Sequence, residues 1–372
     1  MVSKLLRLIR SNTTLNTKRL ILISLLTLPV SLILSACGGR AISNNWHGLA
    51  ADAERAYLSN GTFIYAIDLK TSKEAWHYPA EANSKLMFYA TPVLISDGQL
   101  LIGSAGTSHP FLSLDPATGK EKWAENFTKN KGAWMASPLV FNDMIYAPNA
   151  DGFLYVMDMN GKEAADPVEL GGALWSAPTT DGKLLYVTSL DHHLHIIDPA
   201  NGLSDKSVDL GGAAPSSPAV GSDGVYVGSF DKTIQFVTPT GRKKTIAEAA
   251  DWIWGSPVLS GETLYYTDLK GNIISLDTAS GKQKWNAAQK NDAVVTSLLV
   301  QGNQIYAATE TGNFIALDSE GKIVWEKAVG GNLYTTPVAS GDLILVAPYQ
   351  AEFALAAYDT DGKQAWTFTP EK

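Results

Sequence analysis

The stretch that decides the fold runs from residue 112 to residue 123 and reads Leu112-Ser113-Leu114-Asp115-Pro116-Ala117-Thr118-Gly119-Lys120-Glu121-Lys122-Trp123. An apolar run ends in Asp, a turn with Gly follows, and a second run carries a Trp. A second copy runs from Ile274-Ser275-Leu276-Asp277 through Gly281-Lys282-Gln283-Lys284-Trp285. Short β-forming runs joined by a tight Gly turn are typical of β-hairpins.

The pattern recurs through the chain with a nearly constant period. Its Asp appears at Asp68, Asp115, Asp158, Asp198, Asp277, Asp318 and Asp359, with Thr238 at the remaining position. A small residue followed by Pro runs in phase, at Thr91-Pro92, Ser137-Pro138, Ala177-Pro178, Ser217-Pro218, Ser256-Pro257 and Thr336-Pro337, and Ser297-Leu298 fills the missing place. Successive markers lie 39 to 46 residues apart, which indicates a repeat architecture.

Each period contains four short apolar runs. In the third period we expect strands at about 135–141, 144–148, 153–158 and 162–168, with Asp-Gly or Asn-Gly turns between the later ones. Four antiparallel strands cannot bury both faces alone, and radial stacking of such sheets solves this. The sequence therefore predicts an all-β, eight-bladed propeller over 46–372, with seven blades plus a stray hairpin as the alternative.

The first blade, near Trp46, lacks the small-Pro marker, and the last one is predicted to have its own outer strand at about 363–368. Either side-chain packing alone closes the ring, or residues 41–45 contribute to the closure.

The N-terminus carries a targeting signal. Five basic residues and no acidic one precede an apolar segment, which ends in Leu34-Ser35-Ala36-Cys37-Gly38. This arrangement is typical of a secretory signal and resembles a bacterial lipobox, which would make Cys37 the lipidated first mature residue. We expect a signal peptide at 1–36 and a lipid-anchored tether at 37–45. The location would be the outer membrane of a diderm cell, or otherwise the outer face of the cytoplasmic membrane.

Charge narrows the range of partners. Removing residues 1–36 leaves 24 basic and 37 acidic residues, a formal charge of −13. An acidic surface disfavours nucleic acid and anionic membrane faces as main partners. Because Cys37 is the single cysteine, an intrachain disulfide cannot form.

The repeat resembles the PQQ-like β-propeller family, whose blades read small-Pro-apolar and then apolar-Asp-x-x-Thr-Gly-Lys-x-x-Trp. The resemblance implies that the repeat tryptophans dock each blade against its neighbour, namely Trp76, Trp123, Trp285, Trp325 and Trp366. Blades three to five lack this Trp.

Two classes share the repeat. Quinoprotein dehydrogenases bind PQQ with calcium, many through an adjacent Cys pair that is absent here, and they are longer. Outer-membrane assembly lipoproteins of the BamB type bind proteins without catalysis.

Large side chains three or four residues before the marker Pro are predicted to crowd the channel mouth on one face, where they could bind a ligand or pack between the blades: Tyr89, Trp134, Trp175, Trp254 and Tyr334, with Trp252 close by. Aromatic residues at a concave opening are typical of a binding surface.

His193 and His195 are weak metal candidates because residues two apart share one face of a strand. The sequence contains no nucleophile–base arrangement, so we expect a non-catalytic, monomeric scaffold for other envelope proteins, with no cofactor. The alternatives are a propeller or dehydrogenase that binds PQQ and calcium, and a polysaccharide-binding or adhesion propeller.

Overall fold

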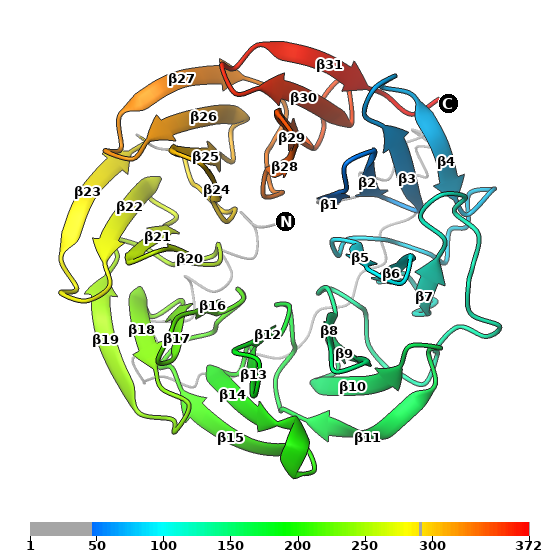
Figure 1. Cartoon of the computed structure of the whole chain (residues 1–372), viewed down its shortest axis with the longest axis horizontal. Helices are drawn as coiled ribbons and strands as arrows, with labels where there is room; N and C mark the ends of the chain where they lie inside the picture. Colours follow the sequence, from blue (N-terminus) through cyan, green and yellow to red (C-terminus); the bar gives the residue numbers. More distant parts are fainter. Residues whose placement is uncertain (1–46, 290–291, 372) are drawn as a thin grey trace, which may run out of the picture. The chain divides into compact units, whose positions relative to one another are not determined.

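The forty-residue repeat folds as an antiparallel meander, and eight such sheets, seven with four strands and one with three, stand in a ring (Figure 1). The computed structural model describes residues 47–289 and 292–371. The predicted eight-bladed propeller is confirmed. The predicted signal peptide, Cys37 and the tether 37–45 lie outside the described residues. Within the described residues, no helix is long and apolar enough to cross a bilayer.

In each blade the strands follow one another in chain order from the centre of the ring to its rim (Figure 1). The innermost strands are β1 (Gly48–Ala51), β5 (Val93–Ile95), β8 (Leu139–Phe141), β12 (Thr179–Thr180), β16 (Ala219–Val220), β20 (Val258–Ser260), β24 (Leu299–Gln301) and β28 (Val338–Ser340). The second strands are β2 (Arg55–Asn60), β6 (Gln99–Gly103), β9 (Met144–Pro148), β13 (Leu185–Thr188), β17 (Val225–Gly228), β21 (Thr263–Thr267), β25 (Gln304–Ala308) and β29 (Leu343–Val346).

The third strands are β3 (Phe63–Asp68), β7 (Phe111–Leu114), β10 (Phe153–Asp158), β14 (His193–Asp198), β18 (Thr233–Val237), β22 (Asn272–Asp277), β26 (Asn313–Asp318) and β30 (Leu355–Asp359). The outer strands are β4 (Glu74–Tyr78), β11 (Glu163–Glu169), β15 (Ser204–Asp209), β19 (Lys243–Glu248), β23 (Gln283–Ala288), β27 (Ile323–Ala328) and β31 (Gln364–Phe368). A single 3-10 turn, η1 (Pro199–Asn201), is present among the described residues.

The second blade departs from the regular pattern. Its sheet has three strands, and the segment at 121–127 pairs with β7 at two isolated bridges, Leu114–Glu121 and Phe111–Phe127, instead of forming a continuous fourth strand. Between the two bridges this segment advances by six residues while β7 advances by three, so the segment bulges away from β7. The result is an irregular outer edge at the position where the other seven blades have a complete strand.

The core lies between the blades rather than inside any one of them. The second and third strands are buried on both faces because each sheet is covered by two neighbours. One cluster, for example, joins Tyr306 and Phe314 of blade seven to Ile344 and Ala356 of blade eight. A blade taken alone would expose these faces, so the ring as a whole is the folding unit.

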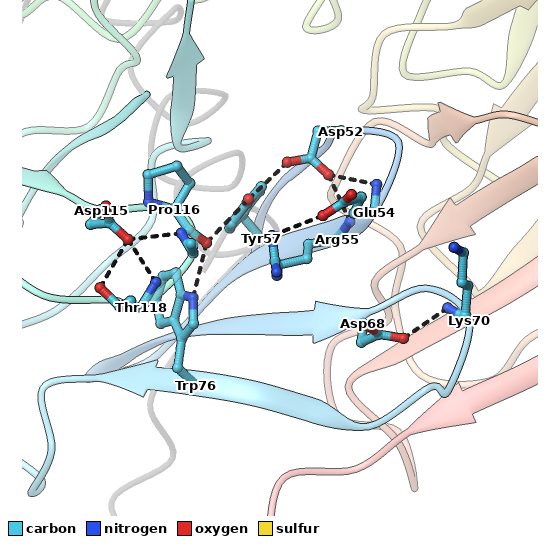
Figure 2. Close-up of polar contacts among 11 residues, drawn as sticks. Asp52, Glu54, Arg55, Tyr57, Asp68, Lys70, Trp76, Asp115, Pro116 and Thr118 are labelled. Carbon is cyan, nitrogen blue, oxygen red and sulfur yellow. Dashed lines mark hydrogen bonds and ion pairs between the residues drawn. The ribbon is translucent and has the colours of Figure 1, made fainter. Parts of the chain in front are cut away.

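The recurring Asp caps the turn between the third and fourth strands. One carboxylate oxygen of Asp115 accepts hydrogen bonds from the backbone N–H of Ala117 and from the N–H and hydroxyl of Thr118, at 2.8–3.0 Å (Figure 2). The Thr118 side-chain bond is the main cause that lowers the pKa of Asp115. Gly119 closes the turn at φ +70°, a conformation that suits glycine.

The repeat Trp seats each blade on the turn of the next. Figure 2 shows Trp76 of the first blade donating from its indole nitrogen to the Pro116 carbonyl, at 3.0 Å. The indole covers Gly119, where a Cβ would lie 2.5 Å from the ring. The corresponding indole-to-carbonyl bonds, each 2.9 Å long, join Trp123 to Met159, Trp285 to Ser319 and Trp325 to Thr360.

At the seams that follow blades three to five, aliphatic side chains lie where the other seams have the repeat Trp. Leu203, in the blade-four turn, packs in one cluster with residues of blade three. Lys206 of blade four lies along Gly241 of blade five, and its ammonium donates to the Thr240 carbonyl at 3.3 Å. Shorter side chains therefore replace the indole at these seams.

Among the described residues, the ring closes between blades eight and one without strand exchange, because all the strands of each blade come from one continuous segment. The alternative closure through residues 41–45 lies outside the described residues. β1 contacts β28, and the Thr335 hydroxyl donates to the His47 carbonyl at 2.5 Å. The predicted outer strand of the last blade is confirmed as β31. At this seam Ser72 (φ +56°) stands at the glycine position, and the buried indole nitrogen of Trp366 has no hydrogen-bond partner among the described residues.

Candidate binding face at the channel mouth

One face of the ring gathers the loops that enter the inner strands and the turns between the second and third strands. Backbone hydrogen bonds join the two sets in successive blades: Leu190 N to Ala173 O, Phe230 N to Ala213 O, and Leu269 N to Trp252 O, at 2.9–3.0 Å. Side chains from both sets therefore surround the mouth of the central channel.

The channel holds a cavity of about 430 Å³ lined by all eight blades. Four of the six predicted mouth aromatics line it: Tyr89, Trp175, Trp254 and Tyr334. All four are partly exposed. We call this cavity with its four aromatic side chains the channel cup.

Trp134 lies elsewhere. It is fully buried between blades two and three, where its ring packs against Phe111 and Tyr155 and its indole nitrogen donates to the His109 carbonyl at 2.9 Å. The reason is the period of two along an extended chain. Trp134 stands four residues before its marker Pro, and the other four stand three before. Met135, which the sequence reasoning did not single out, lines the cup in this blade.

Trp252 stands five residues before its Pro and points out of the cup. Its ring stacks on Phe230 with centroids 4.8 Å apart and an interplanar angle of 17°. Leu190 and Leu269 occupy the same turn position as Phe230 in the two adjacent blades, and all three are partly exposed. We call Leu190, Phe230, Trp252 and Leu269 the mouth arc, which gives blades four to six an apolar edge beside the cup.

Acidic side chains flank the mouth arc. Asp191 and Asp231 follow Leu190 and Phe230 directly, and Asp251 precedes Trp252. Lys232 lies 3.5 Å from the Asp251 carboxylate. The edge is thus apolar in the middle and mainly acidic at its border.

The opposite side of the cup is built from tyrosines and a histidine. Burial and the neighbouring Glu310 raise the pKa of Tyr334 to about 12, and burial raises that of Tyr89. Burial lowers the pKa of His47, whose Nε2 lies 3.1 Å from Asn60 Oδ1, to about 4. These groups are therefore uncharged at neutral pH.

The hydroxyl residues directly before the marker position, which is Pro in most blades and Leu298 in blade seven, link neighbouring blades around the cup. The backbone N–H groups of Ser217, Ser256 and Ser297 donate to the hydroxyls of Ser256, Ser297 and Thr336, at 2.9–3.2 Å. This explains why a hydroxyl residue recurs before Pro, and it identifies these side chains as part of the inner ring.

The cup does not fit PQQ with calcium. Its lining includes no Asp, Glu, Lys or Arg, whereas calcium needs carboxylate and carbonyl oxygens and an anionic quinone needs cations. The two weak metal candidates are engaged elsewhere: His195 pairs with Asp205 at 2.8 Å, and His193 Nδ1 lies 3.0 Å from the Asp191 carbonyl. Among the described residues, no group of three or more His, Cys, Asp or Glu could hold a metal ion.

A second cavity, of about 820 Å³, lies beside the irregular edge of the second blade, between residues 122–129 and the turn at 160–163. Its lining contains Lys and Glu side chains together, and Lys129 pairs with Glu163. Of the residues singled out from the sequence, only Trp123 reaches it.

The fold and the residues of the channel mouth place this protein in the class of eight-bladed β-propellers built from PQQ-like repeats. Its channel is lined by aromatic and uncharged residues. The family model described as outer membrane protein assembly factor BamB matches residues 39–208, 205–287 and 270–372, and the chain belongs to this family.

Individual relatives match over shorter lengths. The outer membrane protein assembly factor BamB of Nitrosomonas eutropha is 27% identical over 113 residues, which are 30% of this chain and 27% of that protein. The quinohemoprotein alcohol dehydrogenase ADH IIB of Pseudomonas putida is 30% identical over 134 residues, 30% of this chain and 19% of the enzyme. The matches thus span less than a third of these curated relatives.

Among solved structures, the crystal structure of BamB from Moraxella catarrhalis superposes with a TM-score of 0.60 at 17% identity, covering 87% of this chain and 93% of that one. At this identity the likeness concerns the fold.

Proposed function

We propose that this protein is a non-catalytic lipoprotein of the cell envelope whose propeller docks other proteins, in outer-membrane protein assembly or a closely similar task. The observation that carries the proposal is the mouth arc. Partly exposed aromatic and aliphatic side chains from three adjacent blades form one apolar edge, and such patches bordered by polar residues are typical of protein-binding sites. Membership of the BamB family supports the same role.

Docking is tested in the protein's own cells. A photo-crosslinking amino acid is placed at Leu190 or Leu269, followed by purification and mass spectrometry. We expect crosslinks to components of outer-membrane protein assembly. Phe230→Ala with Trp252→Ala should then reduce recovery of the partner complex at least about tenfold, because interface aromatics are commonly worth about 2 kcal/mol or more.

The matched control uses two apolar residues far from the mouth. Ile323 and Val324, at the start of the outer strand β27, are 49% and 52% exposed. Replacing both with Ser removes apolar surface without touching the arc, so partner recovery should not change. Crosslinks that form equally well from β27 and from the arc would contradict a specific docking face.

Anchoring rests on the lipobox at Cys37, which we propose is lipidated. Cys37→Ser should move the protein from the membrane fraction to the soluble envelope fraction while the propeller unfolds at an unchanged denaturant concentration. Membrane attachment that survives this substitution would overturn the lipoprotein assignment.

The enzymatic alternative is tested by titration. Because the cup lacks charged side chains, we expect no saturable binding of PQQ in the presence of calcium and no dehydrogenase activity. Stoichiometric PQQ binding would instead place this chain with the quinoproteins.

A further inference from the structure

We propose that the channel cup is a binding site for a neutral saccharide, beside the protein-docking mouth arc. The two adjoin where the ring of Phe230 lies 5.3 Å, between centroids, from that of Trp254. The lining of the cup combines partly exposed aromatic residues with many hydroxyl residues, and it includes no formally charged side chain at neutral pH.

The lining chemistry selects the class of ligand. Ten of the residues that line the cup are Ser or Thr, and Asp, Glu, Lys and Arg are all missing from it. An anionic ligand would enter a molecule of net negative charge without meeting a cation, and a cationic ligand would meet no carboxylate. A neutral molecule with many hydroxyls avoids both costs, because it exchanges hydrogen bonds with Ser and Thr.

Several hydroxyls retain hydrogen-bonding capacity toward a ligand. Ser256, Ser297 and Thr336 each accept one backbone N–H, and none of them donates a hydrogen bond to the described residues. All three residues are partly exposed, so each hydroxyl can donate a hydrogen bond to a ligand oxygen in the cup.

The aromatic walls supply the second half of a sugar site. Trp175 of blade four and Trp254 of blade six line the cup on one side, and Tyr89 and Tyr334, which lie in the loops that enter blades two and eight, line it on the other. A pyranose has an apolar face of C–H groups, which packs against an indole, and an edge of hydroxyls. The cup offers rings at its walls and hydroxyls between them, in the proportion that such a ligand needs.

The cavity volume limits the size of the bound part. About 430 Å³ lies in the range of small-ligand pockets, roughly 300–1,000 Å³. The cup therefore holds the end of a glycan or a short free oligosaccharide rather than an internal stretch of a thick polymer. The two sources share one recognition chemistry, and ligand length distinguishes them.

The test uses calorimetry and tryptophan fluorescence on the purified propeller with four neutral trisaccharides: maltotriose, cellotriose, mannotriose and triacetylchitotriose. At least one should bind saturably, and Trp175→Ala or Trp254→Ala should weaken it about tenfold, as the loss of a buried aromatic anchor does. The matching hexasaccharide then reports the source: equal binding indicates the end of a glycan, of which only the terminal part enters the cup, and weaker binding indicates a short free oligosaccharide that must fit as a whole. Much tighter binding of the hexasaccharide would contradict a cup that holds only a terminal unit.

Trp252→Ala is the matched control, because Trp252 lies on the same face but outside the cup. Trp252→Ala should weaken protein docking strongly and change sugar affinity by less than about twofold, because the Phe230 ring, which contacts both Trp252 and Trp254, remains in place. The two proposals can therefore fail separately. Trp254→Phe keeps a smaller ring and should give an intermediate affinity, which guards against an unfolded alanine variant. If none of the four sugars binds, or if binding ignores Trp175 and Trp254, the proposal is overturned.

Discussion

Because a Trp ring covers Gly119 but not Gly281, we expect the same Gly→Ala substitution to lower the free energy of unfolding much more at Gly119 than at Gly281. Gly119 and Gly281 occupy the same turn position in blades two and six, and both have φ +70°. A Cβ at Gly119 would lie 2.5 Å from the Trp76 ring, whereas at Gly281 the nearest atom is the Ile246 carbonyl oxygen, 3.6 Å away. The backbone strain of an alanine should therefore be the same at both positions, and the difference between them comes from the residue that packs on the turn.

The expected magnitudes follow from these distances. Alanine in the left-handed region costs about 1–2 kcal/mol at either position. At Gly119 the methyl group also overlaps a ring held by its own hydrogen bond, and overpacking of this kind costs about 1–3 kcal/mol more. Gly119→Ala should therefore destabilise the propeller by about 2–5 kcal/mol, and Gly281→Ala by about 1–2 kcal/mol.

Guanidinium unfolding of both variants measures the difference as a shift of the midpoint at constant slope. A double variant, Trp76→Leu with Gly119→Ala, should recover part of the loss, because the methyl group then fills the space that the indole has left. Equal losses for the two glycines, or no coupling between Trp76 and Gly119, would refute the account of the seam.

Three further outcomes are expected. Trp325→Phe removes the bond to the Thr360 carbonyl and should cost about 1 kcal/mol more than Trp366→Phe, because the Trp366 nitrogen has no partner to lose; denaturation curves that coincide would contradict this. The pKa of buried His47 lies near 4 in the folded protein and is about 6.5 in the unfolded chain. As the pH falls below about 6.5, the unfolded chain therefore gains a proton that the folded protein does not. The free energy of unfolding should decrease between about pH 6.5 and pH 4, by as much as roughly 3 kcal/mol. Unfolding of wild type and His47→Gln across this range tests the assignment, and identical pH profiles would exclude it. The lowered pKa of Asp115 acts in the same direction at lower pH: stability is lost as the carboxylate is protonated below about pH 4, and Asp115→Ala should reduce that loss.

The number of blades could be predicted because each copy of the repeat contains the residues that set where its strands begin and end. The strands expected in the third period, at about 144–148 and 153–158, match β9 and β10 in both bounds. Asp-Gly and Asn-Gly turns fix where each strand must end, and the marker Pro fixes where the inner strand begins. Local sequence and global fold agree, which is the condition for prediction from a single chain.

The irregular second blade could not be predicted. Its hairpin is the most complete copy of the repeat, yet the segment at 121–127 leaves the sheet after two bridges. The deviation depends on how many residues bulge between Glu121 and Phe127, and residue pattern alone does not set that number.

At the mouth, residue type was predictable but direction was not. Trp134 and Trp175 stand before equivalent prolines, one position apart, and that single step sends one ring into the core and the other into the cup. The parity of the distance to Pro separates Trp134 from the four aromatic residues that line the cup, but Trp252, five residues before its Pro, lies outside the cup in spite of its parity. Phe230 and the two Leu residues of the mouth arc lie on turns that only the folded ring brings beside the entry loops, so sequence reasoning did not find them.

Closure without strand exchange has a consequence for the order of the blades. Each blade is continuous in the chain, and the contact between β1 and β28 resembles the contacts between other neighbouring inner strands. The nine residues that join β27 to β28 show what a connector between blades requires. A gene rearranged to start at another blade, with such a connector from β31 to β1, would encode the same ring. We therefore expect a circularly permuted chain to fold into the same propeller. Loss or gain of a whole blade would change the circumference of the ring but not the order of the strands within each blade.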